Sequence, residues 1–203
     1  MSTTTTAKKL MTAEEFCDWV HQPEQEDKWF ELVRGEVIEL PSPTKPHGFI
    51  CIRVGHALMS YADQRGFGYV TCNDSGVLLE RDPDTVRGPD VAFYEDANTF
   101  AELHPKYGEV PPRLAVEVLS PNDRANKVLR KINDYLRCGV ELVWIIDPEI
   151  RTVTIHQPGK PQVELMENRE LTGEDVLPGF RCLVGDFFRL PSDKPKPVQS
   201  PPA

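Results

Sequence analysis

The chain has 203 residues, of which 39% are hydrophobic, and this length suits one domain with a full core better than two domains. No stretch approaches the roughly 18 apolar residues that a membrane span needs, and the polar start MSTTTTAKKL is unlike a signal peptide, so we expect a cytoplasmic protein with no membrane partner. The net charge of -9 opposes a nucleic-acid partner, because phosphate binding normally requires a basic surface.

The 5 cysteines and 5 histidines are scattered along the chain. The cysteines are odd in number and form no CxxC pair, which predicts reduced thiols and no disulfide framework. The histidines form no HxxxH pair, so we expect no zinc centre.

The two ends of the chain lack periodic apolar residues, and the C-terminal one is rich in proline. Segments 1–8 and 191–203 are therefore expected to be disordered. Residues 9–190 are expected to fold as one domain.

The folded part is expected to begin with a helix, a hairpin and a second helix. Thr12 and Glu15 form a capping-box pattern at the start of a short helix in MTAEEFCDWV. Two strands flank a tight turn at residues 34–35 of FELVRGEVIEL. Apolar residues at helical spacing then predict a helix from His47 to Gln64.

Short strands are predicted next, at residues 69–72, 76–79 and 90–94, and a short helix between residues 95 and 112. RLAVEVL and LVWII are apolar runs typical of buried strands. A strong helical pattern separates them, which predicts a βαβ unit with a parallel strand pair. TVTIH and VELM are expected to extend the sheet in antiparallel fashion.

The helix of this βαβ unit is expected to run from Pro121 to Cys138. Ser120 is the predicted N-cap, Pro121 the first helical residue and Gly139 the residue past the end. Its predicted apolar face consists of Val128, Leu129, Ile132, Tyr135 and Leu136.

Glu117 is the most informative residue, because it places a carboxylate in the middle of the apolar strand LAVEVL. A buried carboxylate is costly without a charged partner or a metal ion. Asp90 begins another strand, and if the two strands are neighbours both carboxylates converge on a hard cation such as Mg²⁺. Lys131 on the next helix can then orient a water or stabilise phosphoryl charge. The alternative is an ordinary ion pair between Glu117 and a basic residue of that helix.

GPDVAFY, followed by LAVEVLSPNDRANKVLRKINDYLRCGVELVWIIDPE, resembles the Uma family of restriction endonucleases, a branch of the PD-(D/E)XK nuclease superfamily. WFELVRGEVIELPSPTKPHGFI resembles the opening hairpin and helix of that family, so the similarity spans roughly Met11 to Phe188. The resemblance implies a single α/β domain with a restriction-endonuclease-like fold, in which helices flank a mixed central sheet.

The resemblance also assigns site residues. The superfamily's proline–aspartate pair falls on Pro89 and Asp90, and its metal-binding strand acid falls on Glu117. The usual lysine two residues after that acid is replaced by Leu119. The resemblance implies that the following helix supplies this lysine instead, which would place it on Lys131.

Three further residues are possible members of the site on the same resemblance. Lys127, one helical turn before Lys131, is the alternative lysine, and Tyr135 lies one turn after it on the same face. Glu31 in the opening hairpin is a possible additional acid.

The implied function is a Mg²⁺- or Mn²⁺-dependent endonuclease that hydrolyses phosphodiester bonds in DNA. Asp90 and Glu117 would hold the ion, with the backbone carbonyl of Val118 as a further ligand, while Lys131 positions the attacking water. Cutting two strands usually recruits two sites, so a homodimer is expected.

Six basic residues against three acids between residues 113 and 137 predict a local basic patch on the acidic protein. Weaker candidates for phosphate contacts there, since exposed helix charges are usually only solvated, are Arg124, Arg130 and Arg137.

Two alternatives to the enzyme stay open. One is a catalytically silent member that binds nucleic acid or a protein partner through the same surface. The other is a structural ion-pair network of Asp90, Glu117 and Lys131.

His47, at the entry of a helix, is expected to be a cap or a surface group.

Overall fold

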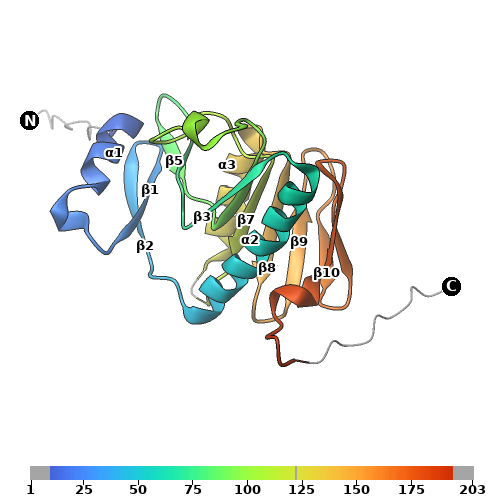
Figure 1. Ribbon diagram of the computed structural model, residues 1–203. Coiled ribbons are helices and arrows are strands. Elements are labelled where there is room, and N and C mark those ends of the chain that lie inside the picture. The colour runs from blue at the N-terminus through green and yellow to red at the C-terminus, as the bar shows by residue number, and fades with distance from the viewer. Residues whose placement is uncertain (1–9, 122, 194–203) are drawn as a thin grey trace, which may run out of the picture.

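Three β-sheets organise the part of the chain that the computed structural model describes, residues 10–121 and 123–193. The largest has the strand order β10-β9-β8-β7-β6-β3, the second β2-β1-β5-β4, and the third pairs β11 with β12. In the largest sheet β7 and β8 are parallel and the other neighbouring pairs are antiparallel, so the predicted mixed sheet is confirmed. Figure 1 shows helices on both sides of it.

The strands are β1 (Trp29–Val33), β2 (Glu36–Leu40), β3 (Tyr69–Cys72), β4 (Val77–Glu80), β5 (Thr85–Arg87), β6 (Val91–Tyr94), β7 (Leu114–Val118), β8 (Leu142–Asp147), β9 (Thr152–His156), β10 (Val163–Met166), β11 (Glu170–Gly173) and β12 (Leu177–Leu183). The α-helices are α1 (Ala13–Val20), α2 (Lys45–Arg65) and α3 (Ala125–Arg137). Short 3₁₀ helices are η1 (Pro23–Gln25), η2 (Phe100–Glu102) and η3 (Val184–Phe187).

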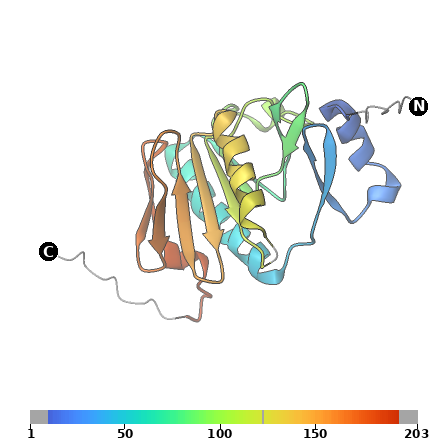
Figure 2. The ribbon, with the colours of Figure 1, turned by 180° about the vertical axis from the view of Figure 1, so that it is seen from behind.

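The central sheet lies between α2 and α3 (Figures 1 and 2). Leu114, Val116 and Val118 of β7 pack in one core cluster with apolar residues of α2, β12 and η3. Ala115, between two of them, packs in a second cluster with apolar residues of α3. Because side chains alternate along a strand, Glu117 lies on the α3 face of β7.

The predicted opening elements are confirmed in type. Thr12 and Glu15 form the expected capping box of α1. Arg34 and Gly35 both have positive φ, as a two-residue hairpin turn between β1 and β2 requires. The second helix begins two residues before the predicted start, at Lys45.

The predicted start of the third helix at Pro121 is wrong. α3 begins at Ala125, and its N-cap is Arg124. The Ser120 N–H instead donates to the Asp123 carboxylate at 2.7 Å, which stabilises a turn in place of the first helical turn.

Leu129 was predicted on the apolar face of this helix, and its exposure of 54% shows that the prediction is wrong. α3 buries Ile132 and Tyr135, and Val128 packs beside them. These residues follow one narrow stripe, and Leu129 lies about 100° around the helix from Val128.

The sequence patterns did not predict β5, β11 or β12. β5 has only three residues, too few for a visible alternation. β12 contains Pro178 and Gly179, which weaken a strand pattern. The short helix expected between residues 95 and 112 is the 3₁₀ helix η2.

Some of the predictions on chain organisation lie outside the described residues, namely the disorder of residues 1–8 and of residues 194–203. The domain limits 9 and 190 therefore stay a prediction. Among the described residues, no helix has the length and apolar character needed to cross a membrane.

Candidate functional site

Strand pairing brings the two predicted carboxylates together. Asp90 immediately precedes β6, and β6 pairs with β7 so that Val91 lies opposite Val116. Glu117, next along β7, is therefore close to Asp90, and both carboxylates line the same cavity. The strands β6 and β7 are therefore neighbours, as the predicted convergence of the two carboxylates requires.

Two residues of α3 bind the Glu117 carboxylate. The Lys131 Nζ donates to its Oε2 at 2.7 Å, and the Tyr135 hydroxyl donates to its Oε1 at 2.6 Å. Lys131 and Tyr135 are four residues apart, so they lie one above the other on the helix face that covers β7. Lys127, one turn earlier, is exposed, and so the structure pairs Lys131 with the strand acid.

Lys131 is held by two further acceptors. Its Nζ lies 3.0 Å from Oε1 of Glu31 on β1 and donates to the Gly88 carbonyl at 3.2 Å. This ammonium group is thus fixed by oxygens from three different segments. Protein oxygens therefore fix the position of the Lys131 ammonium group.

Glu31 connects this centre to a second buried cation. The Arg87 guanidinium donates to Glu31 Oε2 at 2.7 Å and to Asp134 Oδ2 at 2.6 Å. The Gly88 N–H donates to Glu31 Oε1 at 3.2 Å. Lys131, Glu31, Arg87 and Asp134 therefore form one continuous network of charged side chains beside the site.

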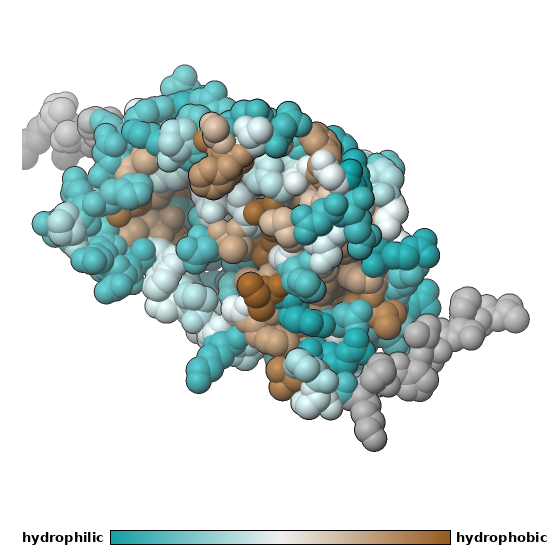
Figure 3. Space-filling model, viewed as in Figure 1, coloured by the Kyte–Doolittle hydropathy of each residue, from teal (hydrophilic) through white to brown (hydrophobic). Residues whose placement is uncertain are grey.

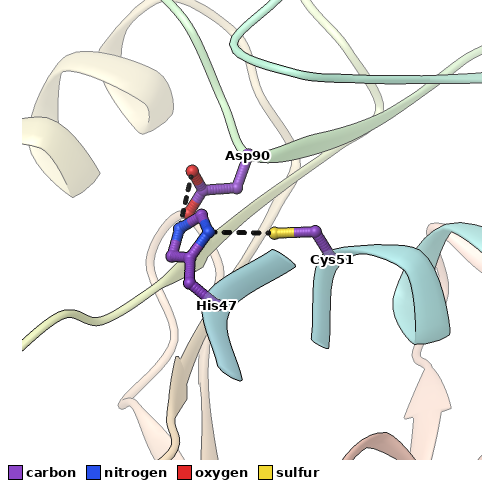
Figure 4. A group of neighbouring side chains, drawn as sticks. All are labelled: His47, Cys51 and Asp90. Atoms are coloured by element: carbon purple, nitrogen blue, oxygen red, sulfur yellow. Dashed lines mark hydrogen bonds and ion pairs between the residues drawn. The ribbon is translucent and has the colours of Figure 1, made fainter. Parts of the chain in front are cut away.

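Asp90 is fixed by two partners that differ in chemistry. The backbone N–H of Val118 donates to its Oδ2 at 2.6 Å, while Nε2 of His47 lies 3.2 Å from its Oδ1. The expectation that His47 is a cap or a surface group is wrong, because its side chain is only 14% exposed and contacts Asp90. The Nδ1 atom of the same ring lies 3.5 Å from Cys51 Sγ (Figure 4).

The electrostatics of the centre are those of crowded, buried carboxylates. Burial raises the pKa of Glu117 to about 8, with Asp90 and Glu31 adding to the rise and Lys131 opposing it. Burial opposes the charged form of Lys131, but Glu117, Glu31 and Asp90 outweigh it and raise the pKa of this lysine. In the same way Lys131 and Arg87 overcome the effect of burial and lower the pKa of Glu31.

A narrow cavity of about 90 Å³ reaches this centre. Its wall includes Asp74, Asp90, Glu117, Val118 and Lys131. The volume is enough for an ion with a few water molecules, since a water in the liquid occupies about 30 Å³. The carboxylates are therefore buried against protein on one side and accessible from the other.

The arginines proposed for phosphate contacts are exposed, as expected of a helix surface. Arg137 donates to Glu80 at 2.9 Å and to Asp134 at 3.3 Å, so its charge is already paired. Arg124 is the N-cap of α3, and Arg130 lies on the exposed surface of the helix.

Sequence reasoning missed several members of the site. Arg87 lies in the three-residue β5, and Asp134 is a helix carboxylate like many exposed ones, so neither has a pattern that marks it as buried. Asp74 follows β3 in a turn. The HxxxC spacing of His47 and Cys51 is a usable signal, which the absence of an HxxxH pair does not exclude.

A pH-dependent stability follows from the contact between His47 and Asp90. The hydrogen bond to Asp90 raises the pKa of His47 from 6.5 to about 10. The folded state therefore binds this proton more tightly than the unfolded chain, and the stabilisation is complete below about pH 6.5 and lost as the pH rises towards 10.

We expect the difference in free energy of unfolding between wild type and His47→Gln to shrink steadily between these two pH values. Urea unfolding in EDTA at about pH 6, 8 and 10 measures it. His56→Gln, on the exposed side of α2, is the control and should show no such trend. A His47→Gln difference that is constant with pH would contradict the assignment.

Comparisons with known proteins agree on one family and one fold. The Uma2 family model, described as "Putative restriction endonuclease", matches residues 13–185, which include every residue of the site described above. The chain is also similar to a crystal structure from Anabaena variabilis described as "a putative nuclease belonging to DUF820", with a TM-score of 0.73 and 20% identity over 88% of this chain and 97% of that chain. A comparison with curated proteins finds no match. At this identity the structural likeness establishes the fold alone.

Proposed function

The chain belongs to the Uma2 family of restriction-endonuclease-type nucleases, and on that premise we propose that it is a metal-dependent endonuclease that hydrolyses phosphodiester bonds in DNA. One observation carries the proposal. Asp90, directly before β6, and Glu117, on the neighbouring strand β7, line one cavity together with the partly buried Lys131. A cation site beside a fixed positive charge is the arrangement that phosphodiester hydrolysis needs.

The residues present suit a hard divalent cation. Asp90 and Glu117 offer carboxylate oxygens, the ligands that Mg²⁺ and Mn²⁺ prefer, and the Val118 carbonyl is a proposed additional ligand. The raised pKa of Glu117 supports this assignment, because burial and the neighbouring acids disfavour its negative charge and a bound cation would offset both effects. The bound ion would supply charge stabilisation to the phosphate and lower the pKa of a water ligand.

Lys131 is the proposed catalytic lysine. Its ammonium group stays protonated beside Glu117 and Glu31, so its role is to donate hydrogen bonds rather than to take up a proton. It can hold the attacking water or stabilise the charge that develops on a phosphoryl oxygen. Three fixed acceptors orient it before substrate arrives, which lowers the cost of reorganisation during the reaction.

The other residues of the network act by positioning these groups. Tyr135 fixes one oxygen of Glu117 and leaves the other to Lys131. Arg87 holds Glu31 in place through an ion pair, and Glu31 in turn forms an ion pair with Lys131. These contacts therefore fix the positions of the Glu117 and Lys131 side chains in the cavity wall.

Exposed basic residues near the start of α3 are the proposed contacts for the DNA backbone. Ser120 and Asp123, in the turn before α3, line the cavity, and Arg124 is the N-cap of that helix. Arg130 is exposed further along the same helix. This local surface can bind phosphate although the whole chain carries a charge of -9. A homodimer, expected from double-strand cutting, stays a prediction.

Incubation with supercoiled plasmid tests the proposal. Purified protein should convert the plasmid to nicked or linear forms in Mg²⁺ or Mn²⁺, and not in EDTA. Glu117→Gln, which keeps the shape of the side chain but removes its charge, should lose the activity. Glu164→Gln, an exposed glutamate of β10, is the matched control and should cut like wild type.

Two results would overturn this function. Equal cutting by wild type and Glu117→Gln would show that the nicking comes from a contaminant or from another site. Salt-dependent DNA binding by wild type without any cleavage would assign the chain to the silent, nucleic-acid-binding class.

A further inference from the structure

A second group of metal-ligating side chains lies on the other side of Asp90. His47 and Cys51 of α2 and the Asp90 carboxylate each offer a ligand atom, and these atoms all lie within 4.8 Å of one another. Figure 4 shows the His47 ring of α2 between the other two side chains, with Asp90 at one ring nitrogen and Cys51 at the other. Glu117, the second acid of the proposed nuclease centre, is not a member of this group.

The helix places two of the ligands by its periodicity. His47 and Cys51 are four residues apart, so their side chains lie one above the other on the same face of α2. The same separation joins the paired histidines of helical zinc sites. The proline at the start of α2 and the Thr44 N-cap fix where this first turn begins.

We propose that His47, Cys51 and Asp90 bind a thiophilic divalent ion such as Zn²⁺, at a site distinct from the one that Asp90 forms with Glu117. A thiolate, an imidazole and a carboxylate together select zinc over the hard cation Mg²⁺. Three protein ligands also leave a fourth tetrahedral position for water.

The Asp90 ligand is already oriented for this site. Its Oδ2 accepts the N–H of Val118 at 2.6 Å, and its Oδ1 is the oxygen that faces His47, at 3.2 Å. The backbone of β7 therefore holds the carboxylate from behind. Fixing a ligand through its second oxygen is a common means of orienting metal sites.

A large cavity gives an ion access to the cluster. It has a volume of about 690 Å³, and His47, Cys51, Asp74 and Asp90 all contribute to its wall. Figure 3 shows hydrophobic side chains gathered over α2 on this face of the molecule. A mainly apolar wall around a few polar groups strengthens their interaction with a cation.

Ion binding requires modest changes at the cluster. The Nδ1 atom of His47 faces Cys51 and its Nε2 atom faces Asp90, and one ion binds only one of these nitrogens, so the His47 side chain must rotate until one nitrogen faces both other ligands. The Cys51 thiol must lose its proton, and His47 must bind as neutral imidazole. Both protons pass to solvent, and no oxidant or reductant is involved.

Cobalt titration tests the proposal, because Co²⁺ takes the place of Zn²⁺ and reports a bound thiolate. We expect a sulfur-to-cobalt charge-transfer band in the near ultraviolet, which Zn²⁺ should abolish by displacement. Cys51→Ser should remove the band. Cys72→Ser, an exposed cysteine on the wall of the same cavity, is the matched control and should keep it.

Zinc affinity, measured by calorimetry, gives a second readout that needs no cysteine variant. Loss of a partner that merely orients a ligand costs roughly 10- to 100-fold in metal affinity, so His47→Gln, which removes a ligand, should weaken Zn²⁺ binding by about 100-fold or more. Glu117→Gln should keep the cobalt band, because Glu117 belongs to the other site. Failure of the nuclease proposal would therefore leave this test intact.

Three results would overturn the zinc site. One is the absence of a charge-transfer band in wild type at saturating Co²⁺, and another is a band that survives in folded Cys51→Ser. The third is a His47→Gln variant that binds Zn²⁺ as tightly as wild type. Circular dichroism of each variant establishes that it is folded.

Discussion

Changing Lys131 to methionine is expected to lower the rate of DNA cleavage by about 100- to 1,000-fold, the usual loss when one preorganised charge-stabilising donor is removed. Methionine keeps most of the length and apolar surface of the lysine stem. It removes the ammonium group that contacts Glu117 at 2.7 Å and Glu31 at 3.0 Å. Single-turnover cleavage of plasmid in saturating Mg²⁺ measures the effect on the chemical step.

Lys127→Met is the matched control for this prediction. Lys127 lies one turn earlier on α3 and is exposed, so its variant should cleave at close to the wild-type rate. Near wild-type cleavage by Lys131→Met would contradict the role given to this lysine. Strong loss in Lys127→Met alone would transfer that role to the other helix position.

The Arg87→Met variant should lower the free energy of unfolding by about 3 to 5 kcal/mol, the range observed when one partner of a buried ion pair is removed. The Arg87 side chain is only 10% exposed, and its guanidinium lies between Glu31 and Asp134. Without it, both acids lose a buried counter-charge, and Glu31 also loses the partner that fixes its carboxylate beside Lys131. Urea denaturation monitored by circular dichroism measures the change.

Arg137→Met controls for the loss of an arginine near the same acid. Arg137 also contacts Asp134, at 3.3 Å, but its side chain is 49% exposed. Exposed pairs contribute about 0 to 1 kcal/mol, so this variant should unfold close to wild type. Equal stability of the Arg87 and Arg137 variants would show that burial of the network has no energetic importance.

Much of the fold was predictable because its elements follow regular periods. The apolar runs of β7 and β8, separated by a strongly amphipathic helix, predicted the parallel pair at the centre of the sheet. The turn at Arg34 and Gly35 predicted the hairpin of β1 and β2. The start of α3 was mispredicted because Ser120 and Asp123 form a local turn that has the composition of a helix N-terminus.

The candidate site was only partly predictable from single residues. A carboxylate within LAVEVL indicated that Glu117 needs a partner, but spacing alone could not choose between a metal ion and an ion pair. Family resemblance indicated Asp90 and Lys131, and strand pairing and helix periodicity bring these three residues together. Arg87 contacts the site through tertiary packing, which leaves no periodic trace in the sequence.

Anomalous diffraction from a crystal soaked in Mn²⁺ tests the central claim most directly, because it locates the ion and its ligands in one measurement. A peak about 2.0 to 2.6 Å from carboxylate oxygens of both Asp90 and Glu117, the range for hard cations and oxygen ligands, is the predicted result. No peak between these residues at saturating Mn²⁺, with Lys131 still occupying the space between Glu117 and Glu31, would contradict it. The cluster would then be a structural ion-pair network.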